Sequence, residues 1–485
     1  MQPPSPALSG SLASRFLGHL GDLGVVGFFF DTAASQARDG ALGFRVLAHT
    51  KRWYAETKSS TIRLNMGGKP LVITKDPRVY KQVLGASQKY FTNSHDFRKR
   101  MGYFIPQSMI VLEGDQWARV RKVATRAIAM QEIDHLPAYV VETMAKFMKT
   151  KDGTITMDPI EVFPLVGFDV FHKIMYKWDP DTVSKSPEGT ALLEQARTCA
   201  KALGARQILP FEWLWRLPLP SNRRVDAARD ALRQHTMDFI KSRSQTVDNT
   251  TSASLLDCML VAAANGKLTQ VELVGQIQTF FFGSFETTSH TISLLLNHLA
   301  EHSHVQDKLR AELQATFPGG KDTITTLEAL DRCTYLTWVV HESMRLAPHA
   351  AVLPRTCIEP CSIHGLSFER GDEVLIHSAN ASRDPENYPG QTDLEQFRPD
   401  RFGQVSLNKT ATMPFGFGSR ICPGRKIAMG ELKAICAYTV MGWHLSRPAN
   451  VPFLLDLTVG LGMRKAHGML IWTPMTQSDC STLKY

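Results

Sequence analysis

The chain has 485 residues, 43% of them hydrophobic and 21% charged, and 55 Lys and Arg against 46 Asp and Glu give a formal net charge of +9. Such a composition can bury a large core, and the length permits either one large domain or several small ones. The positive charge favours acidic partners. Nucleic acid is not favoured among them, because the sequence lacks basic blocks interleaved with aromatic residues and lacks zinc-ligand spacings.

The first 44 residues predict a poorly defined lead-in, because they are rich in Ala, Ser, Gly and Pro. Their most apolar run, residues 23–30, is bounded by Asp22 and Asp31. Spanning a bilayer takes about 20 apolar residues, so we expect no transmembrane helix here. The early basic region of a secretory signal is also not found. We therefore expect an intracellular protein, cytoplasmic or peripheral at the endoplasmic reticulum.

A β-hairpin is the first element that the sequence predicts. Residues 61–66 alternate in polarity, Gly67 and Gly68 turn, and residues 70–74 return. A helix is expected over residues 79–84, and from there to about residue 350 the pattern is mostly helical. The Ser-, Thr-, Asn- and Asp-rich residues 241–254 predict a surface loop.

The strongest predicted helix runs from about residue 269 to 301. Thr269 and Glu272 have the spacing of a capping box. Proline is absent from residues 268–317, and the segment is apolar nearly all round. A helix of this kind lies buried at the centre of a large domain, so one domain is favoured over several.

After Pro348 the pattern changes to short strands over residues 352–357, 361–368 and 373–377. A long coil is expected over residues 382–413, then a helix over 424–441 and a β stretch over 453–472. The predicted fold class is mainly α with minor β sheets, in one large domain covering residues 45–485.

Residues 414–425, with the sequence PFGFGSRICPGR, carry the clearest chemical signal. Their glycines allow a tight turn and a close approach to a flat ligand. Cys422 lies just before a predicted helix, where unpaired N–H groups favour a thiolate, and Pro423 suits the first helical position. The arrangement favours a thiolate bound to heme iron. The other seven cysteines are scattered without Cys-x-x-Cys spacing and predict reduced thiols in a reducing compartment.

This segment resembles the heme-binding signature of the cytochrome P-450 superfamily, in its eukaryotic form. Further segments resemble the family's motifs in the same order: Trp117 to Arg121, Glu342 to Arg345, and residues 397–402 (FRPDRF). The resemblance covers roughly residues 45–485. It implies the cytochrome P-450-like fold and heme b as cofactor.

The resemblance also implies roles for individual residues. Cys422 would be the axial iron ligand, and the remaining cofactor-binding residues would be Trp117, Arg121, Arg355, Phe415, Gly418, Arg420 and Gly424. Guanidinium groups suit the two propionates because they can pair bidentately with a carboxylate. Ordinary surface arginines remain an alternative for Arg121 and Arg355. Glu342 and Arg345 would form a structural triad with Arg401.

Within the long helix, residues 283–288 (GSFETT) resemble the family's oxygen-activation segment. The resemblance implies that Thr287 bonds the oxygen and that Glu286 relays protons as the catalytic pair. A helical Thr that bonds back to its own backbone is the alternative. Ser284 departs from the family pattern, in which glycine is usual, and an additional hydroxyl there could narrow the oxygen groove.

We expect a monooxygenase that inserts one oxygen atom from O2 into a lipophilic small molecule, such as a product of secondary metabolism. Electrons would come from a separate NADPH-dependent flavin reductase, docked on the basic residues 119–126 and 425–426. Alternatives are an oxygen-independent heme-thiolate isomerase or dehydratase, and a non-catalytic heme-binding protein. Substrate contacts implied by the resemblance, each equally explained as core, are Phe104, Ile105, Phe282, Phe285, Ala351, Val352, Leu461 and Met463. Peripheral membrane contact is expected rather than a span, because the N-terminal anchor of most eukaryotic relatives is not recognised.

Overall fold

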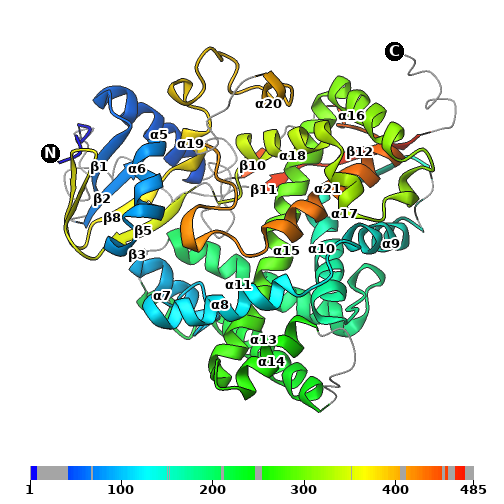
Figure 1. The fold of residues 1–485 in the computed structure, drawn as a ribbon, viewed down its shortest axis with the longest axis horizontal. Coiled ribbons are helices and arrows are strands. Elements are labelled where there is room, and N and C mark those ends of the chain that lie inside the picture. The colour runs from blue at the N-terminus through cyan, green and yellow to red at the C-terminus, as the bar shows by residue number, and fades with distance from the viewer. Residues whose placement is uncertain are drawn as a thin grey trace.

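The computed structural model describes residues 2–7, 42–66, 69–149, 151, 153–208, 212–245, 254–350, 352–404, 411–449, 454–456 and 465–475. A sheet gathers at one end of the molecule and helices form most of the rest (Figure 1). The prediction of a mainly helical fold with minor sheets is confirmed. Residues 8–41 lie outside the described residues, so the lead-in and the domain boundary at residue 45 stay predictions.

The main sheet has five strands in the order β1-β2-β8-β5-β3. The predicted hairpin is present as β1 (Thr61–Met66) and β2 (Lys69–Thr74). β2 pairs in parallel with β8 (Glu373–Ile376), which lies against β5 (Leu353–Cys357), and β5 pairs with β3 (Phe91–Asn93). The sheet therefore joins strands that are almost 300 residues apart in the chain.

Three short helical pieces follow the hairpin, and longer helices form most of the rest of the described chain. After α6 (Pro77–Lys81) the chain forms a π-helical turn, η1 (Gln82–Ala86), and the 3-10 turn η2 (Gln88–Tyr90). The longer helices are α5 (Leu42–Thr57), α7 (His95–Phe104), α8 (Gly114–Ala129), α9 (Leu136–Met148), α10 (Pro159–Tyr176), α11 (Pro187–Ile208), α13 (Pro220–Ser244), α14 (Leu255–Ala264), α16 (Ser303–Thr316) and α18 (Thr334–Leu346). Shorter ones are η3 (Thr182–Ser184), α12 (Trp213–Arg216), η4 (Lys321–Thr323) and α17 (Leu327–Asp331).

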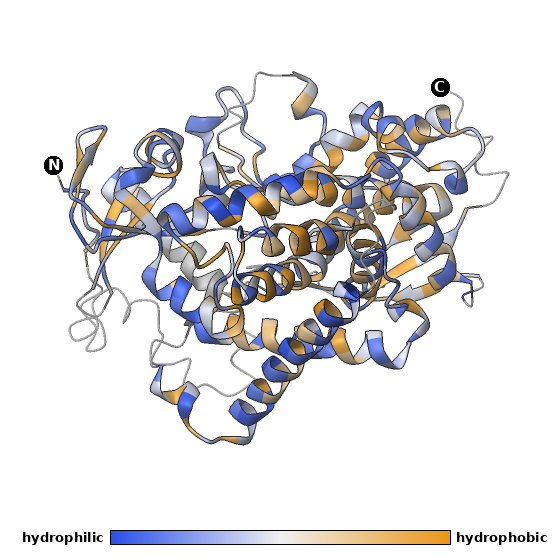
Figure 2. Ribbon diagram, turned by 60° about the horizontal axis from the view of Figure 1, so that its bottom comes forward, coloured by the Kyte–Doolittle hydropathy of each residue, from blue (hydrophilic) through white to orange (hydrophobic). Residues whose placement is uncertain are grey.

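Helix α15 (Gln270–Glu301) crosses the centre of the helical part. It has 32 residues and so extends about 48 Å. The Thr269 hydroxyl and the Glu272 carboxylate bond each other's backbone N–H groups, which confirms the predicted capping box. Most of the helix is buried, and apolar residues concentrate toward the middle of the helical part (Figure 2). The helix therefore forms one long wall for any cavity in the interior.

After α18 the described chain is largely irregular, as expected for residues 382–413. It contains β6 (Cys361–Ile363), β7 (Leu366–Phe368), α19 (Ser378–Ala381), η5 (Pro385–Asn387) and α20 (Arg401–Gln404). Helix α21 (Arg425–Gly442) has Gly424 as its N-cap, so Pro423 precedes the cap instead of occupying the first helical position. The expectation for Pro423 was wrong because the turn that ends at Gly424 is non-helical.

The C-terminal β stretch is divided among separate sheets. β12 (Leu470–Pro474) pairs with β9 (Trp443–Ser446) and with β4 (Ile155–Met157), while β10 (Leu454–Asp456) pairs with β11 (Lys465–His467). Among the described residues, no helix combines the length and the apolarity needed to cross a membrane.

Candidate functional site

A cavity of about 470 Å³ lies between α15 and the N-terminal half of α21. Residues of α8, α10, the strand β5 and the loop before α21 also line it. Most of the lining is apolar, which is the usual character of a small-molecule or cofactor site. The cavity brings together these residues that the sequence analysis singled out: Trp117, Arg121, Phe282, Glu286, Thr287, Val352, Arg355, Phe415, Arg420, Cys422 and Gly424.

The loop that carries Cys422 is held in shape by glycine conformation and by backbone hydrogen bonds. Gly416 and Gly418 both have positive φ, +76° and +71°, and the Cys422 N–H donates to the Phe415 carbonyl at 2.9 Å. A Cβ on Gly418 would lie 2.0 Å from the Leu84 carbonyl oxygen at the end of α6 and η1. Gly418 is therefore required for close backbone packing, and it lies outside the residues that line the cavity.

The Cys422 thiol faces the cavity. Its side chain is accessible from that space, although protein surrounds it. Burial raises the pKa of the thiol above its ordinary value, while the Gly424 N–H and the Arg121 guanidinium act in the opposite direction. The N–H group at the helix N-terminus thus lowers the pKa of the thiol, but the effect of burial is larger and the net pKa is raised. A bound metal cation would hold the sulfur deprotonated.

Arg121 and Arg420 bring positive charge to one side of the cavity. Arg121 donates to the Ile421 carbonyl, and burial lowers its pKa. Arg420 pairs with Glu113, donates to the Met109 carbonyl at 3.2 Å and lies 4.0 Å above the Trp117 ring. Burial lowers the pKa of Arg420 to about 10.

Arg355 adds a third cation, from strand β5. Its side chain is buried, donates to the Pro354 carbonyl at 2.8 Å, and has its pKa lowered to about 10 by burial. Glu113 raises the pKa of Arg355, but that carboxylate already pairs with Arg420. Buried cations without matched carboxylates are costly, so this wall of the cavity favours an anionic ligand. Heme b, which carries two carboxylates, fits the three arginines and the facing thiol.

The segment expected to activate oxygen lies on α15, in the wall of the cavity that Cys422 also lines. Glu286 and Thr287 are half-buried and line the cavity. The Thr287 hydroxyl donates to the Gly283 carbonyl at 3.0 Å, which is the backbone bond considered as the alternative reading. Its oxygen retains lone pairs that can accept a hydrogen bond. The Ser284 hydroxyl donates to the Phe281 carbonyl at 2.9 Å, which ties it to the helix.

The residues expected to contact a substrate divide into three groups. Phe282 and Val352 line the cavity. Phe104, Ile105 and Phe285 are buried in the main core and lie outside the cavity lining. Ala351, Leu461 and Met463 lie outside the described residues. The lining also contains residues that the sequence did not reveal, including Phe171 and Met175 of α10, His349, and Glu431 of α21. The first two carry no signal that separates them from ordinary core residues.

Glu342, Arg345 and Arg401 meet in a fully buried ion triad. Arg345 binds Glu342 bidentately, with Nε to Oε2 at 2.7 Å and Nη2 to Oε1 at 2.8 Å. Arg401 Nε donates to Glu342 Oε1 at 2.9 Å. The arginines also donate to backbone carbonyls between residues 382 and 396. The triad therefore fastens the irregular segment to α18, as a structural role requires.

The basic residues expected to dock a reductase do not all face outward. Arg121 is half-buried and lines the cavity, whereas Arg119 pairs with Glu272 at 2.6 Å and stays 42% exposed. Lys122, Arg126, Arg425 and Lys426 are exposed. Of the six cations, therefore, only Arg121 is not exposed.

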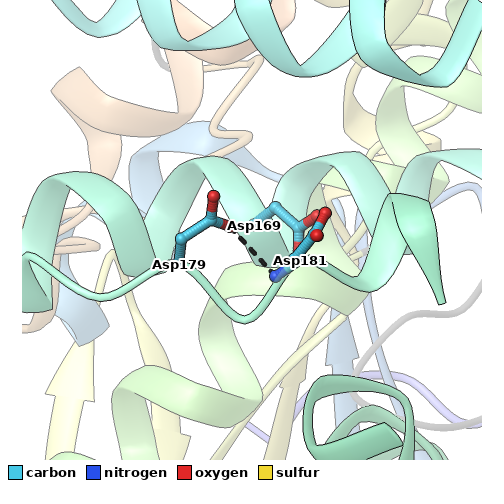
Figure 3. A group of neighbouring side chains, drawn as sticks. All are labelled: Asp169, Asp179 and Asp181. Carbon is cyan, nitrogen blue, oxygen red and sulfur yellow. Dashed lines mark hydrogen bonds between the residues drawn. The ribbon is translucent and has the colours of Figure 1, made fainter. Parts of the chain in front are cut away.

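Three carboxylates gather elsewhere, where the chain leaves α10 (Figure 3): Asp169, Asp179 and Asp181. The Asp169 oxygens accept from the N–H groups of Thr182 at 2.9 Å and Val183 at 3.0 Å. The other two carboxylates pair with lysines, at 3.1 Å and 2.6 Å. These hydrogen bonds and ion pairs explain the cluster structurally, because they hold the loop after α10 against that helix.

Comparison with known proteins agrees with this geometry. Residues 45–471 match the family described as Cytochrome P450. Cytochrome P450 3A29 of Sus scrofa is 27% identical over 421 residues, which cover 81% of this chain and 80% of that protein. Cytochrome P450 3A28 of Bos taurus is 39% identical over 169 residues, which cover 34% of this chain and 32% of that protein. The probable cytochrome P450 4ac3 of Drosophila melanogaster is 33% identical over 213 residues, 43% of this chain and 40% of that protein.

Proposed function

Because the chain belongs to the cytochrome P450 family, whose members bind heme b, we propose that it is a heme-thiolate monooxygenase with Cys422 as the iron ligand. One observation carries the proposal: among the described residues, one cavity with a mainly apolar lining contains the Cys422 thiol together with Glu286 and Thr287 of α15. When bound, the heme-thiolate group supplies activation of O2, so that one oxygen atom enters the substrate and the other leaves as water.

The chain's own residues would hold the cofactor by charge and shape. Arg121, Arg355 and Arg420 would pair with the two propionates through their guanidinium groups. Among the described residues Arg121 and Arg355 have no paired carboxylate, whereas Arg420 also binds Glu113. Trp117 supports Arg420 through the contact between ring and cation. Phe415 lines the cavity and would shield the sulfur from water, while the Gly424 N–H would donate to the sulfur.

Glu286 and Thr287 would manage protons on the opposite side of the cavity. Thr287 keeps an acceptor lone pair toward the cavity while its own proton is bonded to Gly283. Glu286 lies next to it and can exchange protons through water. Because Ser284 is tied to the Phe281 carbonyl, its hydroxyl competes less for the same water.

We further propose a lipophilic substrate, because the cavity wall is mainly apolar and includes Phe282 and Val352. Burying apolar substrate surface would supply most of the binding free energy. Trp213 and Leu219 near α12 are exposed, Trp213 by 60%. Such apolar side chains would support a peripheral membrane contact.

Electrons would come from a separate NADPH-dependent flavin reductase that docks near Lys122, Arg126, Arg425 and Lys426. Lys122 and Arg126 lie on α8, and Arg425 and Lys426 lie on α21. Both helices border the Cys422 loop. Raising the ionic strength should slow reduction by an acidic reductase. An unchanged rate in high salt would contradict docking at this surface.

The absorption spectrum of the reduced, CO-treated protein tests the iron ligand. We expect a red-shifted Soret band in the wild type and its loss in Cys422→Ala. Cys436→Ala is the matched control, because this buried thiol lies on α21 away from the cavity, and it should keep the band. A normal spectrum in Cys422→Ala, or a purified protein without porphyrin, would overturn the proposal.

Oxygen-independent isomerase or dehydratase chemistry is the alternative that remains within the family. It predicts product without NADPH-dependent consumption of O2. A non-catalytic heme protein predicts neither product nor coupled consumption. Measuring both quantities together separates the three functions.

A further inference from the structure

The cavity wall that α15 forms contains hydroxyl groups among its apolar side chains. Thr279, Ser284, Thr287, Thr288 and Thr291 all line the cavity. Residues four apart on a helix return to nearly the same face. Thr279, Thr287 and Thr291 are separated by eight and four residues, so they share one face of α15 along the cavity.

The hydroxyl protons on this face are already bonded to the helix backbone. Thr279 donates to the Gly275 carbonyl at 2.7 Å, and Thr287 donates to the Gly283 carbonyl at 3.0 Å. Thr291 donates to the Thr287 carbonyl at 2.8 Å. A hydroxyl whose proton is engaged still has lone pairs that can accept a hydrogen bond. This face of α15 therefore offers acceptors, and not donors, to a molecule in the cavity.

A backbone bond of this kind does not by itself mark a site, because helical hydroxyls commonly make it. Ser289 and Ser293 also donate to carbonyls four residues earlier, yet neither lines the cavity. Thr279 differs from them because it lies in the cavity lining, where Phe280 and Phe282 follow it. Valine would fill this apolar wall without the cost of burying a polar group, so the hydroxyl requires a reason.

The position of Thr279 is remote from the segment proposed to handle oxygen. Thr279 lies eight residues before Thr287, so the two positions are about 12 Å apart along α15. A substrate group bonded to Thr279 would therefore lie at the opposite end of the molecule from the part near Thr287. Such a bond can select which part of a lipophilic chain lies near Thr287 without taking part in the reaction.

The charges of the lining favour a neutral group over an anionic one. The described lining contains the cations Arg121, Arg355 and Arg420, which the heme propionates would occupy. Burial lowers the pKa of His349 to about 4, so this lining residue is neutral near pH 7. Glu286 is the charged residue that α15 contributes to the lining, and its carboxylate would repel an anion.

We propose that Thr279 determines substrate specificity: it accepts a hydrogen bond from a hydroxyl or amine group at one end of a lipophilic substrate, whose other end then lies near Thr287. This inference rests on the proposed monooxygenase function and adds a donor group to the lipophilic substrate class. It disfavours fatty acids, because an ionised carboxylate has no proton to donate.

Equilibrium dialysis against the holoenzyme tests the donor with three probes that share one carbon chain: decanol, decyl methyl ether and decanoate. We expect decanol to bind about fivefold more tightly than decyl methyl ether, which has no donor, and decanoate to bind most weakly. Equal binding of decanol and its ether, or no measurable binding of any of the three probes, would overturn the inference.

Variants at position 279 assign the preference to this hydroxyl. Thr279→Val should bind decanol and its ether within about twofold of each other, whereas Thr279→Ser should keep the preference for decanol. Thr236→Val is the matched control and should also keep it. Thr236 is buried on α13, donates to the Leu232 carbonyl at 2.8 Å and lies outside the cavity lining. A full preference for decanol in Thr279→Val would show that another group accepts the bond and would refute the role of Thr279.

The products of decanol turnover give a second measurement. Because the donor is held about 12 Å from Thr287, oxygen should enter near the methyl end of decanol. Thr279→Val should spread the products along the chain. The same product distribution in the wild type and in Thr279→Val would contradict the inference.

The two proposals fail in different ways. Dialysis measures binding without NADPH or O2, so it still gives a result if the Cys422 spectrum contradicts the monooxygenase proposal. A normal Cys422 spectrum together with equal binding of decanol and its ether would refute only the role of Thr279.

Discussion

Replacing Glu342 by glutamine should destabilise the protein far more than an ordinary change on a helix. Glu342 and both of its arginine partners are 0% exposed, and the carboxylate is the shared acceptor of Arg345 and Arg401. Removing one partner of a buried ion pair costs about 3–5 kcal/mol, because the remaining charge is left unpaired. Glutamine keeps one acceptor oxygen, so we expect about 3 kcal/mol for Glu342→Gln and about 5 kcal/mol for Glu342→Ala.

A loss of this size is a large part of the total stability of a folded domain, about 5–15 kcal/mol. Denaturant unfolding of the purified holoenzyme, followed by far-UV circular dichroism and by heme absorption, measures it. We expect the midpoints of both signals to fall together, because the triad fastens residues 382–401 to α18.

An exposed pair of similar spacing provides the control. Glu328 and Arg332 pair at 3.3 Å with exposures of 81% and 63%. Such surface pairs contribute at most about 0.5 kcal/mol, so Glu328→Gln should be nearly silent. Equal losses for Glu328→Gln and Glu342→Gln, or a loss below about 1 kcal/mol for the latter, would refute the reasoning from burial.

Three further predictions concern other parts of the fold. Arg355→Ala should weaken heme retention about tenfold, because a propionate would lose its guanidinium partner; the rate of heme transfer to another protein measures this. The same change should leave the unfolding midpoint of the apoprotein unchanged or raised, because the buried cation lacks a matched carboxylate, and denaturation of the apoprotein measures that midpoint. Gly418→Ala should destabilise the protein much more than Gly416→Ala, since only the first would bring a Cβ against the Leu84 carbonyl, and thermal unfolding of the two variants tests the difference. Hydrogen bonds and ion pairing lower the pKa of Glu272 to about 2, so its stabilisation is present above about pH 4.5 and is lost as the pH falls toward 2. Glu272→Gln should therefore be about 2 kcal/mol less stable than wild type at pH 7, with a difference that narrows in acid.

Local sequence patterns were sufficient wherever the stabilising groups lie close together in the chain. The capping box of α15 depends on residues three apart, and the β1–β2 hairpin depends on an alternation and a turn. The Cys422 loop depends on glycines within a few residues of the cysteine. Backbone geometry and short-range bonds determine such features, so the family and its cofactor could be recognised from them.

Long-range packing decided the rest, since it sets which way each side chain faces. Phe282 and Phe285 lie on one helix and have the same chemistry, yet only Phe282 lines the cavity. Arg121 was expected at a docking surface, but it is half-buried and lines the cavity. Glu431 lies in the cavity wall because α21 packs on α15.

The sequence alone thus determined which residues could carry the chemistry, because motif spacing depends on the chain itself. Only the tertiary structure decided which of them share one cavity, because burial and pairing depend on contacts between segments hundreds of residues apart. A raised pKa at Glu431 or a buried triad at Glu342 exists only after those segments exclude water from the charged groups.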